Sequence, residues 1–436
     1  MQNELKKYYS WLLLNERRLD PPLTTNLTIA MKRREIIKRL SLAPLATGLL
    51  VGTPFESLNA APLSSKRDLF KELGLRTFIN AAGNYTSMTA SLMNDETMDA
   101  IQSSSKEYVM LDEVHDTVGQ KIAELCKAEA AMITAGCWSA LVLGTAGVLT
   151  GMDPKKVTQL PKLEGTGMKS EVIIQKSHIN GYHHALTNTG VSIVSVETLE
   201  EAENAINDRT AMLWFLNREA PVGKIQHQQW LELGKKHNLP NMLDMAADVP
   251  PVENLWKYNV MGFDLVCISG GKAICGPQST GILMGKKELI AAARLNGPPA
   301  GGNIGRGMKV NKEEMIGMYV ALDSYIKRDH AQDWKIWEAR IELIKSALKT
   351  IKGVTTEVIV PPVANHTPSL EISWDRNKVN VTRDEFVKKI RTGSPSIEVI
   401  GWEKEDSIRI TVFMLKTGQE KIVAKRIQEE LLKASA

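Results

Sequence analysis

The sequence predicts an α/β protein with a mostly parallel sheet, followed by a smaller C-terminal α+β domain. Short apolar runs alternate with longer helical patterns in the middle of the chain, which is typical of a parallel sheet covered by helices. These runs are apolar throughout, as expected for strands that are buried on both faces. After Asn311 the pattern changes to two long amphipathic helices and to strands with period-two alternation.

The individual elements follow from these patterns. In the first region the buried strands are expected at Glu171–Gln175, Val191–Val196, Ala211–Leu216, Asn241–Leu243 and Asp264–Ile268. Helices are expected between them at Leu199–Asn207 and Gln228–His237. In the second region we expect helices at Asn311–Lys327, Trp334–Lys352 and Gly418–Lys433, and strands at Ser369–Trp374 and Ser407–Phe413. The predicted organisation is a leader (1–60), an N-terminal arm (61–115), a large domain (116–310), and linker helices with a small domain (311–436).

Charge and cysteine content narrow the class of protein. Residues 1–60 hold nine basic and five acidic residues, whereas the rest of the chain holds 45 of each. The body therefore has no net positive charge, and we expect no nucleic-acid partner. The four cysteines form no CxxC pair and the histidines no HExxH pattern, so we expect no metal.

The leader resembles a bacterial twin-arginine export signal. Met31 opens a segment in which Arg33 and Arg34 precede two apolar residues and a lysine, and a mildly apolar stretch follows at about Leu40–Val51. That stretch is too short for a membrane helix, so we expect no stable membrane insertion of the mature chain. The expected location is periplasmic, reached through the twin-arginine export machinery. The alternative is an amphipathic basic helix on a cytoplasmic protein, and either residue 1 or Met31 is the start.

One lysine follows a predicted strand in an unusual setting. The stretch Cys267–Leu283 reads CISGGKAICGPQSTGIL, with Lys272 directly after Gly270 and Gly271. Lysine is among the residues least often buried, so its place at a strand end suggests that it reacts. The two glycines would let the backbone approach a ligand without a Cβ clash.

Three further features are expected to converge with this lysine. Asp244 ends a predicted strand, at the edge where ligands bind in open α/β sheets, and it needs a positive partner such as a protonated ring nitrogen. The small residues Gly136–Ser139, with Cys137 and Trp138 between them, open an apolar helix and would offer backbone N–H groups to a phosphate. The hydroxyl of Ser269 could add to that site. Alternatively, Asp244 caps a helix or turn, and the small residues Gly136–Ser139 only allow their helix to pack closely.

Together these features indicate a pyridoxal 5'-phosphate site. Lys272 would form the Schiff base, and Asp244 would keep the pyridine nitrogen protonated, which makes the ring an electron sink. His178 lies after a predicted strand, where a flat side chain could cover the ring, and His183 competes for that role. A purely structural role for either histidine is the alternative.

Four stretches resemble one family of known enzymes: INAAGNYTSMTASLM (79–93), DMAADVPPVENL (244–255), FDLVCISGGKAICGPQSTGILMG (263–285) and GRGMKVNKEEMIG (305–317). The family is the pyridoxal-phosphate fold type I group of D-glucosaminate-6-phosphate ammonia lyase and selenocysteine synthase (L-seryl-tRNA selenium transferase). The resemblance implies an aspartate aminotransferase-like large domain and a homodimer or higher homo-oligomer.

The same resemblance implies roles for individual residues. Lys272 would be the Schiff-base lysine and Asp244 its pyridine partner. The positions that match phosphate contacts are Gly136, Cys137 and Ser269. Gln278 and Ser279 would lie near the neighbouring subunit's cofactor. Arg306 and Lys309 would hold a carboxylate or phosphate of the substrate, with a solvated helix start as the equal alternative.

The chain also departs from the family pattern. Cys137-Trp138 replaces smaller residues in the phosphate turn, and residues 152–169 look like an insertion. We also expect no counterpart of the tRNA-binding N-terminal domain of selenocysteine synthase. We therefore expect a lyase of the ammonia-lyase or dehydratase type, acting on a hydroxylated amino acid or an amino-sugar acid. The alternatives are a transferase of the selenocysteine synthase type, an aminotransferase or racemase, and a non-catalytic cofactor-binding protein.

Overall fold

The computed structural model describes residues 67–401 and 404–435. Residues up to Glu72, with the short helix α3 (Leu69–Glu72), form a unit apart from Leu73–Ala436, which is described below by itself. The predicted leader, residues 1–60, lies outside the described residues, so its interpretation as an export signal stays a prediction.

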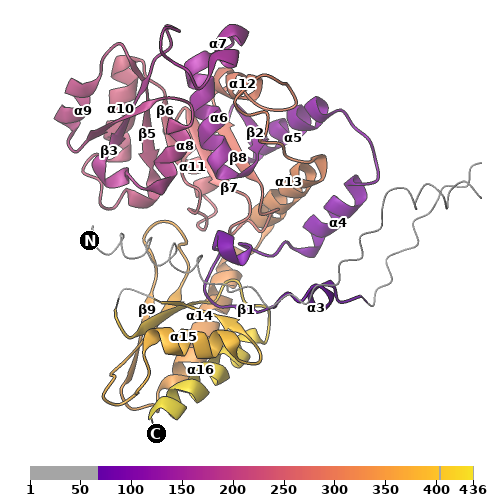
Figure 1. Cartoon of the computed structure of the whole chain (residues 1–436), viewed down its shortest axis with the longest axis vertical. Helices are drawn as coiled ribbons and strands as arrows, with labels where there is room; N and C mark the ends of the chain where they lie inside the picture. The colour runs from indigo at the N-terminus through magenta and orange to yellow at the C-terminus, as the bar shows by residue number, and fades with distance from the viewer. Residues whose placement is uncertain (1–66, 402–403, 436) are drawn as a thin grey trace, which may run out of the picture. The chain divides into compact units, whose positions relative to one another are not determined.

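A seven-stranded sheet forms the centre of the larger unit (Figure 1). Its strand order is β2-β8-β7-β6-β5-β3-β4. The strands are β2 (Ala130–Thr134), β3 (Glu171–Gln175), β4 (Ser192–Val196), β5 (Thr210–Leu216), β6 (Asn241–Asp244), β7 (Leu265–Ser269) and β8 (Gly281–Gly285). Only β8 runs antiparallel to its neighbours among these pairs, so the prediction of a mostly parallel sheet is confirmed.

Helices cover both faces of this sheet because its strands are apolar on both sides. In β5, Leu213 and Phe215 point into one core, and Met212 and Trp214 point into the other. The first core is completed by α5 (Leu111–Cys126), α9 (Leu199–Ala205), α10 (His227–His237), α11 (Asn254–Met261) and α13 (Lys312–Lys327). The second core is completed by α6 (Gly136–Thr150), α8 (His184–Thr187) and α12 (Lys287–Leu295), and the short helix α7 (Pro154–Gln159) follows α6.

The C-terminal region builds a second, antiparallel sheet of order β12-β13-β10-β9. Its strands are β9 (Val354–Ile359), β10 (Ser369–Trp374), β12 (Ile400–Gly401) and β13 (Ser407–Thr411). It shares a core with α14 (His330–Leu348), α15 (Arg383–Thr392) and α16 (Gln419–Ser435). The predicted α+β character of the small domain is therefore confirmed. The helix α13, expected to act as a linker, instead buries Met315, Met318 and Leu322 in the core of the large sheet.

The N-terminal arm is tied to both domains. Its strand β1 (Ile79–Asn80) pairs in parallel with β11 (Ile397–Glu398), and its helix α4 (Asp95–Ser104) packs on α13. Between them lies the 3₁₀ turn η1 (Thr86–Met88). Other 3₁₀ turns follow strands of the large sheet: η2 (Lys176–His178), η3 (Gly181–His183) and η4 (Asn217–Glu219).

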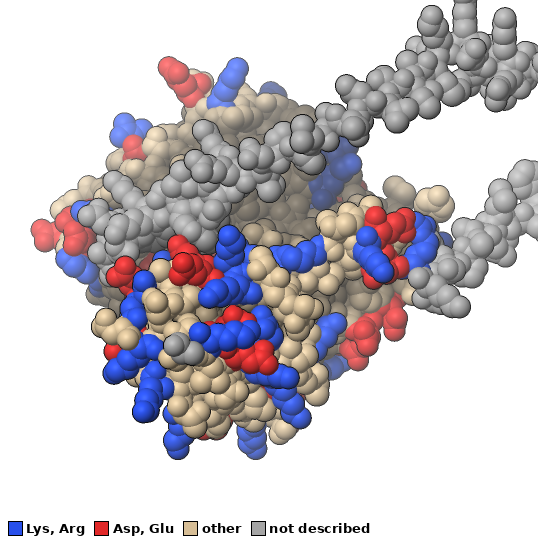
Figure 2. Space-filling model, turned by 60° about the horizontal axis from the view of Figure 1, so that its bottom comes forward, with Lys and Arg blue, Asp and Glu red and all other residues tan. Residues whose placement is uncertain are grey.

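The described surface is mixed in charge. On the face shown in Figure 2, acidic side chains lie among the basic ones. Within residues 67–401 and 404–435, no helix has the length and apolarity needed to cross a bilayer.

Candidate active site

The predicted site residues meet at one edge of the seven-stranded sheet. The parallel strands β6 and β7 end at Asp244 and Ser269, so both residues lie at the same edge. The strand β2 is separated from β7 by two antiparallel pairings and therefore runs in the same direction as β7. Its carboxyl end leads into Gly136 at the start of α6. This edge thus brings together the Gly136–Ser139 turn, Asp244 and the loop between β7 and β8 that carries Lys272 (the lysine loop), as the sequence predicts.

Lys272 is half-buried in a tight loop between β7 and β8. A Cβ on Gly270 would lie 2.3 Å from the Sδ of Met318, and a Cβ on Gly271 would lie 2.5 Å from the Cα of Gln278. The expectation that these glycines make room for a ligand is therefore corrected, because the space is filled by the protein itself. Their role is to let the lysine loop fold closely on its own returning strand and on α13.

Asp244 is a buried carboxylate at the end of β6. It is 3 % exposed, and its Oδ1 accepts a hydrogen bond of 2.9 Å from the backbone N–H of Ala246. Burial raises the pKa of Asp244, while that hydrogen bond and the charge of Lys272 act in the opposite direction. Asp244 forms no ion pair with any described residue, so a cationic group bound at this edge would stabilise its charged form.

Two thiols lie beside this carboxylate. The Sγ of Cys137 is 3.9 Å from Oδ1 of Asp244 and 3.3 Å from the Sγ of Cys267. The three side chains keep their potential ligand atoms within 4.8 Å of one another. Because the thiol of Cys137 faces the sheet, a phosphate contact of this residue would come from its backbone N–H. Burial raises the pKa of Cys267 well above its ordinary value, so this thiol stays protonated.

The first turn of α6 has uncapped backbone N–H groups, as the sequence predicts. Its N-cap residue, Ala135, provides no side-chain cap for the first-turn N–H groups. The Ser139 hydroxyl donates to the Ala135 carbonyl (2.8 Å) and is buried, and Trp138 is 40 % exposed. Gly136 adopts φ +80°, and a Cβ on Gly281 would lie 2.5 Å from the Gly136 carbonyl carbon. Strand β8 thus fixes the position of this turn through close backbone contact.

A second buried acid, Asp248, lies close enough to this site for its charge to interact with those of Asp244 and Lys272. Its Oδ2 accepts a hydrogen bond of 2.7 Å from the Asn217 amide, which also donates to the Tyr258 hydroxyl at 2.7 Å. Burial raises the pKa of Asp248 to about 7, and the charge of Asp244 acts in the same direction. The apolar strand before it and its partner Asn217, far along the chain, gave no local signal of this network.

His178 contacts Leu216 at the end of β5, the residue that pairs with Asp244 in the next strand. It is fully buried, its Nδ1 accepts a hydrogen bond of 3.2 Å from the Leu216 N–H, and its ring meets Phe215 edge-on at 4.5 Å. Burial lowers its pKa to about 4. These contacts favour the structural alternative for His178. The competing His183 stacks on His184 at 4.6 Å, and its role beside a cofactor stays a prediction.

The remaining predicted residues are exposed. The Gln278 amide donates to the Thr86 carbonyl (3.1 Å), and the Ser279 hydroxyl donates to Glu314 (2.5 Å). Arg306 and Lys309 lie in the loop between α12 and α13. Within the described part of the chain, neither forms a hydrogen bond through its side chain or an ion pair with the lysine loop, so their substrate role stays a prediction.

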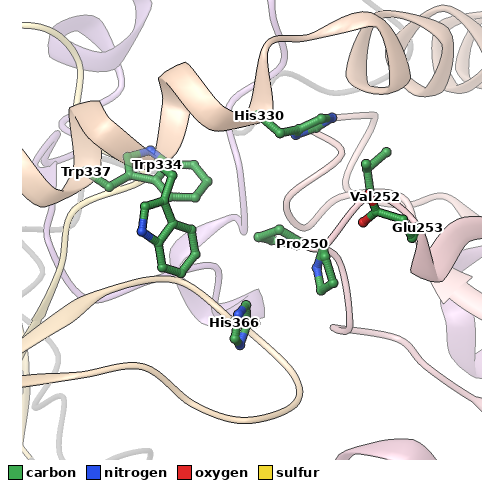
Figure 3. Close-up of a pocket in the computed structure, with 8 residues that line it drawn as sticks. Pro250, Val252, Glu253, His330, Trp334, Trp337 and His366 are labelled. Carbon is green, nitrogen blue, oxygen red and sulfur yellow. The ribbon is translucent and has the colours of Figure 1, made fainter.

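A cavity of about 320 Å³ lies where the loop after Asp248 faces α14 (Figure 3). Its walls are largely aromatic and proline side chains: Pro250, Pro251, Val252, Glu253, His330, Trp334, Trp337 and His366. None of the predicted site residues lines it. A small-domain loop reaches the same strand-end loop, since the Asn365 N–H donates to the Ala247 carbonyl (2.7 Å).

Known proteins resemble this chain over most of its length. The Aminotransferase class-V family matches residues 188–356. D-glucosaminate-6-phosphate ammonia lyase from Salmonella typhimurium is 25% identical over 341 residues, which cover 76% of this chain and 88% of the relative. The chain is a pyridoxal-phosphate enzyme with the fold type I architecture.

Other relatives of this pyridoxal-phosphate enzyme differ in activity. A 5'-C-glycyluridine monooxygenase-decarboxylase from a Streptomyces species is 23% identical and covers 83% of this chain and 92% of the relative. An L-seryl-tRNA(Sec) selenium transferase from Aquifex aeolicus is 25% identical but covers only 53% of this chain and 56% of the relative. The solved structure of a D-glucosaminate-6-phosphate ammonia-lyase matches with a TM-score of 0.74 and 22% identity, over 85% of this chain and all of that chain. That match confirms the fold type I architecture.

The residues at the sheet edge fit pyridoxal phosphate. A primary amine, a buried carboxylate without an ion-pair partner among the described residues, and an uncapped helix start lie together at this edge. These are the groups that could hold, respectively, an aldehyde carbon, a protonated ring nitrogen and a phosphate.

Proposed function

We propose that this enzyme is a lyase that releases ammonia from a hydroxylated amino acid or an amino-sugar acid. The observation that carries the proposal is that Lys272 and the buried Asp244 lie at the same sheet edge, in a chain that is similar to an ammonia lyase over 88% of that relative's length. The overall reaction converts the hydroxylated amino acid into a 2-oxo acid and ammonia, with the water lost in elimination regained on hydrolysis.

Each residue of the site has a separate role in this proposal. Lys272 would hold pyridoxal phosphate through its amine, and the same amine would take the proton from the α-carbon of the substrate. The Asp244 carboxylate holds a proton on the ring nitrogen, and the first turn of α6 binds the phosphate through its N–H groups. When bound, the cofactor supplies an electron sink for the charge left on the α-carbon. Arg306 and Lys309 are proposed to orient the carboxylate or phosphate of the substrate.

Asp248 offers a proton close to this site. It is buried, its pKa is raised to about 7, and its charge interacts with that of Lys272. We infer that a protonated Asp248 limits the negative charge around the lysine, which leaves Asp244 as the anion that balances a cationic ring.

The alternatives share the same site and differ in product. A transferase of the selenocysteine synthase type is supported by the similarity to the selenium transferases, although that match covers about half of the Aquifex aeolicus relative. The body of this chain carries 45 basic and 45 acidic residues outside positions 1–60, which does not favour a tRNA partner. An aminotransferase or racemase would use Lys272 and Asp244 in the same way.

The proposal is tested by product analysis. The purified enzyme, loaded with pyridoxal phosphate, is incubated with a panel of hydroxylated amino acids and amino-sugar acids. Release of equal amounts of ammonia and 2-oxo acid supports the lyase, and loss of both in Lys272→Ala assigns the activity to this site. Racemised or transaminated product without free ammonia would instead support one of the alternatives.

We further propose that the enzyme is exported as a folded homo-oligomer through the twin-arginine machinery to the periplasm. The support is the Arg33-Arg34 motif with its following apolar stretch. The test is to replace both arginines by lysine and to fractionate cells. Retention of the uncleaved chain in the cytoplasm supports export, and an unchanged distribution contradicts it.

A further inference from the structure

A segment of the N-terminal arm is bonded directly to the loop that carries Lys272. The backbone N–H of Ser91 donates to the Gly271 carbonyl at 3.0 Å, and the Ser91 hydroxyl donates to the Lys272 carbonyl at 2.5 Å. At the other end of the loop, the Gln278 amide donates to the Thr86 carbonyl at 3.1 Å. The lysine loop is thus held to the arm at both ends.

The two bonds from Ser91 have a specific geometric consequence. The Gly271 carbonyl belongs to the peptide plane before the Cα of Lys272, and the Lys272 carbonyl belongs to the plane after it. Fixing both planes fixes φ and ψ of Lys272 and therefore the direction of its Cα–Cβ bond. Within the loop, Gly270 is bonded to Thr280 and Gly276, and the Cys275 N–H also donates to the Lys272 carbonyl, whereas the Gly271 carbonyl is held by Ser91.

A turn in the arm directly precedes Ser91 and sets its position. Thr89 and Ala90 both adopt left-handed backbone conformations, with φ of 61° and 53°, which residues with a Cβ seldom use. Their N–H groups donate to the Thr86 and Tyr85 carbonyls (both 3.0 Å), so the turn closes on itself directly before Ser91.

Ser91 itself is enclosed at the end of this turn. It is 6 % exposed, and its Oγ also lies 3.6 Å from the Sδ of Met414 in the small domain. The hydroxyl is therefore committed to the protein and is not free to contact a substrate.

We propose that Ser91 is a positioning residue, which aims the Lys272 amine at the cofactor aldehyde by fixing the backbone on both sides of the lysine. The inference rests on the proposed role of Lys272. It assigns a function to the arm motif 79–93, which lies outside the region matched by the Aminotransferase class-V family.

The test uses the full chain, freed of cofactor and remixed with pyridoxal phosphate. Ser91→Ala removes the hydroxyl bond but keeps the backbone bond, and the matched control is Ser103→Ala, whose hydroxyl donates to Ala100 within α4. The readouts are the rate of covalent attachment, followed by visible absorbance and borohydride trapping, and the melting temperature. Loss of one such hydrogen bond is expected to slow attachment roughly three- to tenfold in Ser91→Ala, with Ser103→Ala unchanged.

The outcomes separate the inference from the proposed function. If wild type shows no attachment at Lys272, the proposed function fails and so does the inference built on it. If wild type attaches cofactor and a folded Ser91→Ala attaches it at the same rate, only the positioning role is overturned.

If Ser91→Ala does not fold, Ser91→Cys replaces it, since a thiol keeps most of the volume but is a weaker donor. A slower rate in folded Ser91→Cys supports the inference, and a wild-type rate overturns it. Ser91→Thr, which restores a hydroxyl, is expected to recover part of the rate lost in Ser91→Ala.

Discussion

The Sγ of Cys137 lies 3.9 Å from Oδ1 of Asp244, and the Cys267 thiol lies 3.3 Å from Cys137 on the same side. The Cys137 thiol donates to this buried carboxylate, and the Cys267 thiol lies within 4.8 Å of it; both lower the pKa that burial raises. Burial raises the pKa of Asp244, and its charged form is favoured by the Ala246 N–H, by the charge of Lys272 and, after these, by the neutral thiols of α6 and β7.

Removing the Cys267 thiol should raise the pKa of Asp244 and weaken cofactor binding. Cys267→Ala removes a thiol that lowers the pKa of Asp244, so this pKa rises further and the uncharged form is favoured. We expect the affinity of the apoenzyme for pyridoxal phosphate to fall roughly three- to tenfold, while Cys267→Ser, which keeps a donor, stays near wild type. Cofactor titration by fluorescence checks this, with buried Cys126→Ala as the control. Equal affinities in all four proteins would contradict the proposed contact.

Removing the charge itself should have a larger effect. Asp244→Asn keeps the shape of the side chain but cannot balance a cationic ring nitrogen. Breaking a buried pair of charges typically costs about 3–5 kcal/mol, so we expect activity to fall by roughly two to three orders of magnitude. Steady-state rates of ammonia release provide the measurement. Activity within a few-fold of wild type would show that Asp244 does not partner the ring.

The phosphate turn depends on the absence of a side chain at Gly281. A Cβ there would lie 2.5 Å from the Gly136 carbonyl carbon and 2.6 Å from the Cys137 nitrogen, both backbone atoms that cannot move alone. Gly281→Ala is expected to destabilise the fold by about 1–3 kcal/mol and to weaken cofactor binding. The control is Gly301→Ala, because a Cβ on Gly301 meets nothing within 4 Å. Thermal melts and titrations of both variants test this, and indistinguishable results would refute it.

Asp248 predicts a pH dependence of stability. Its carboxyl pKa is raised from 3.8 to about 7 in the folded chain. Between these values the folded state keeps a proton that the unfolded state has lost, so this contribution is full below about pH 4 and is lost as pH rises through 7. Asp248→Asn removes the titration. Its melting temperature relative to wild type should therefore rise between pH 5 and pH 8, and parallel pH profiles would argue against a shifted Asp248.

Much of the large domain follows from local sequence pattern. Strand β3 begins and ends where the apolar run EVIIQ does, and β4 to β7 differ from prediction by one residue at most at each end. Strands β2 and β8 were not predicted. The run GILMG of β8 is short and bounded by glycines, and its place between β2 and β7 depends on pairing with segments far away in the chain.

The site residues also differ in whether the local sequence predicts them. Lys272, Asp244 and the α6 turn carry local signals, because each ends a strand or opens a helix among small residues. Asp248 and Ser91 do not, since their roles depend on partners distant in sequence; the Ser91–Lys272 bond spans 181 positions. His178 followed a strand as expected, but its ring turned toward Phe215 in the core. Side-chain direction after a strand end is set by packing, which a local pattern does not contain.

Mapping the lysine to which pyridoxal phosphate attaches tests most directly whether Lys272 is the reactive residue. Wild type and Lys272→Ala, both as full chains, are incubated with pyridoxal phosphate, reduced with borohydride and mapped by peptide mass. We predict a visible absorbance band in wild type and a reduced cofactor mass on the peptide that contains Lys272, with neither in the variant. Attachment at another lysine, or equal labelling of the two proteins, would contradict the central claim that Lys272 is the reactive residue of this enzyme.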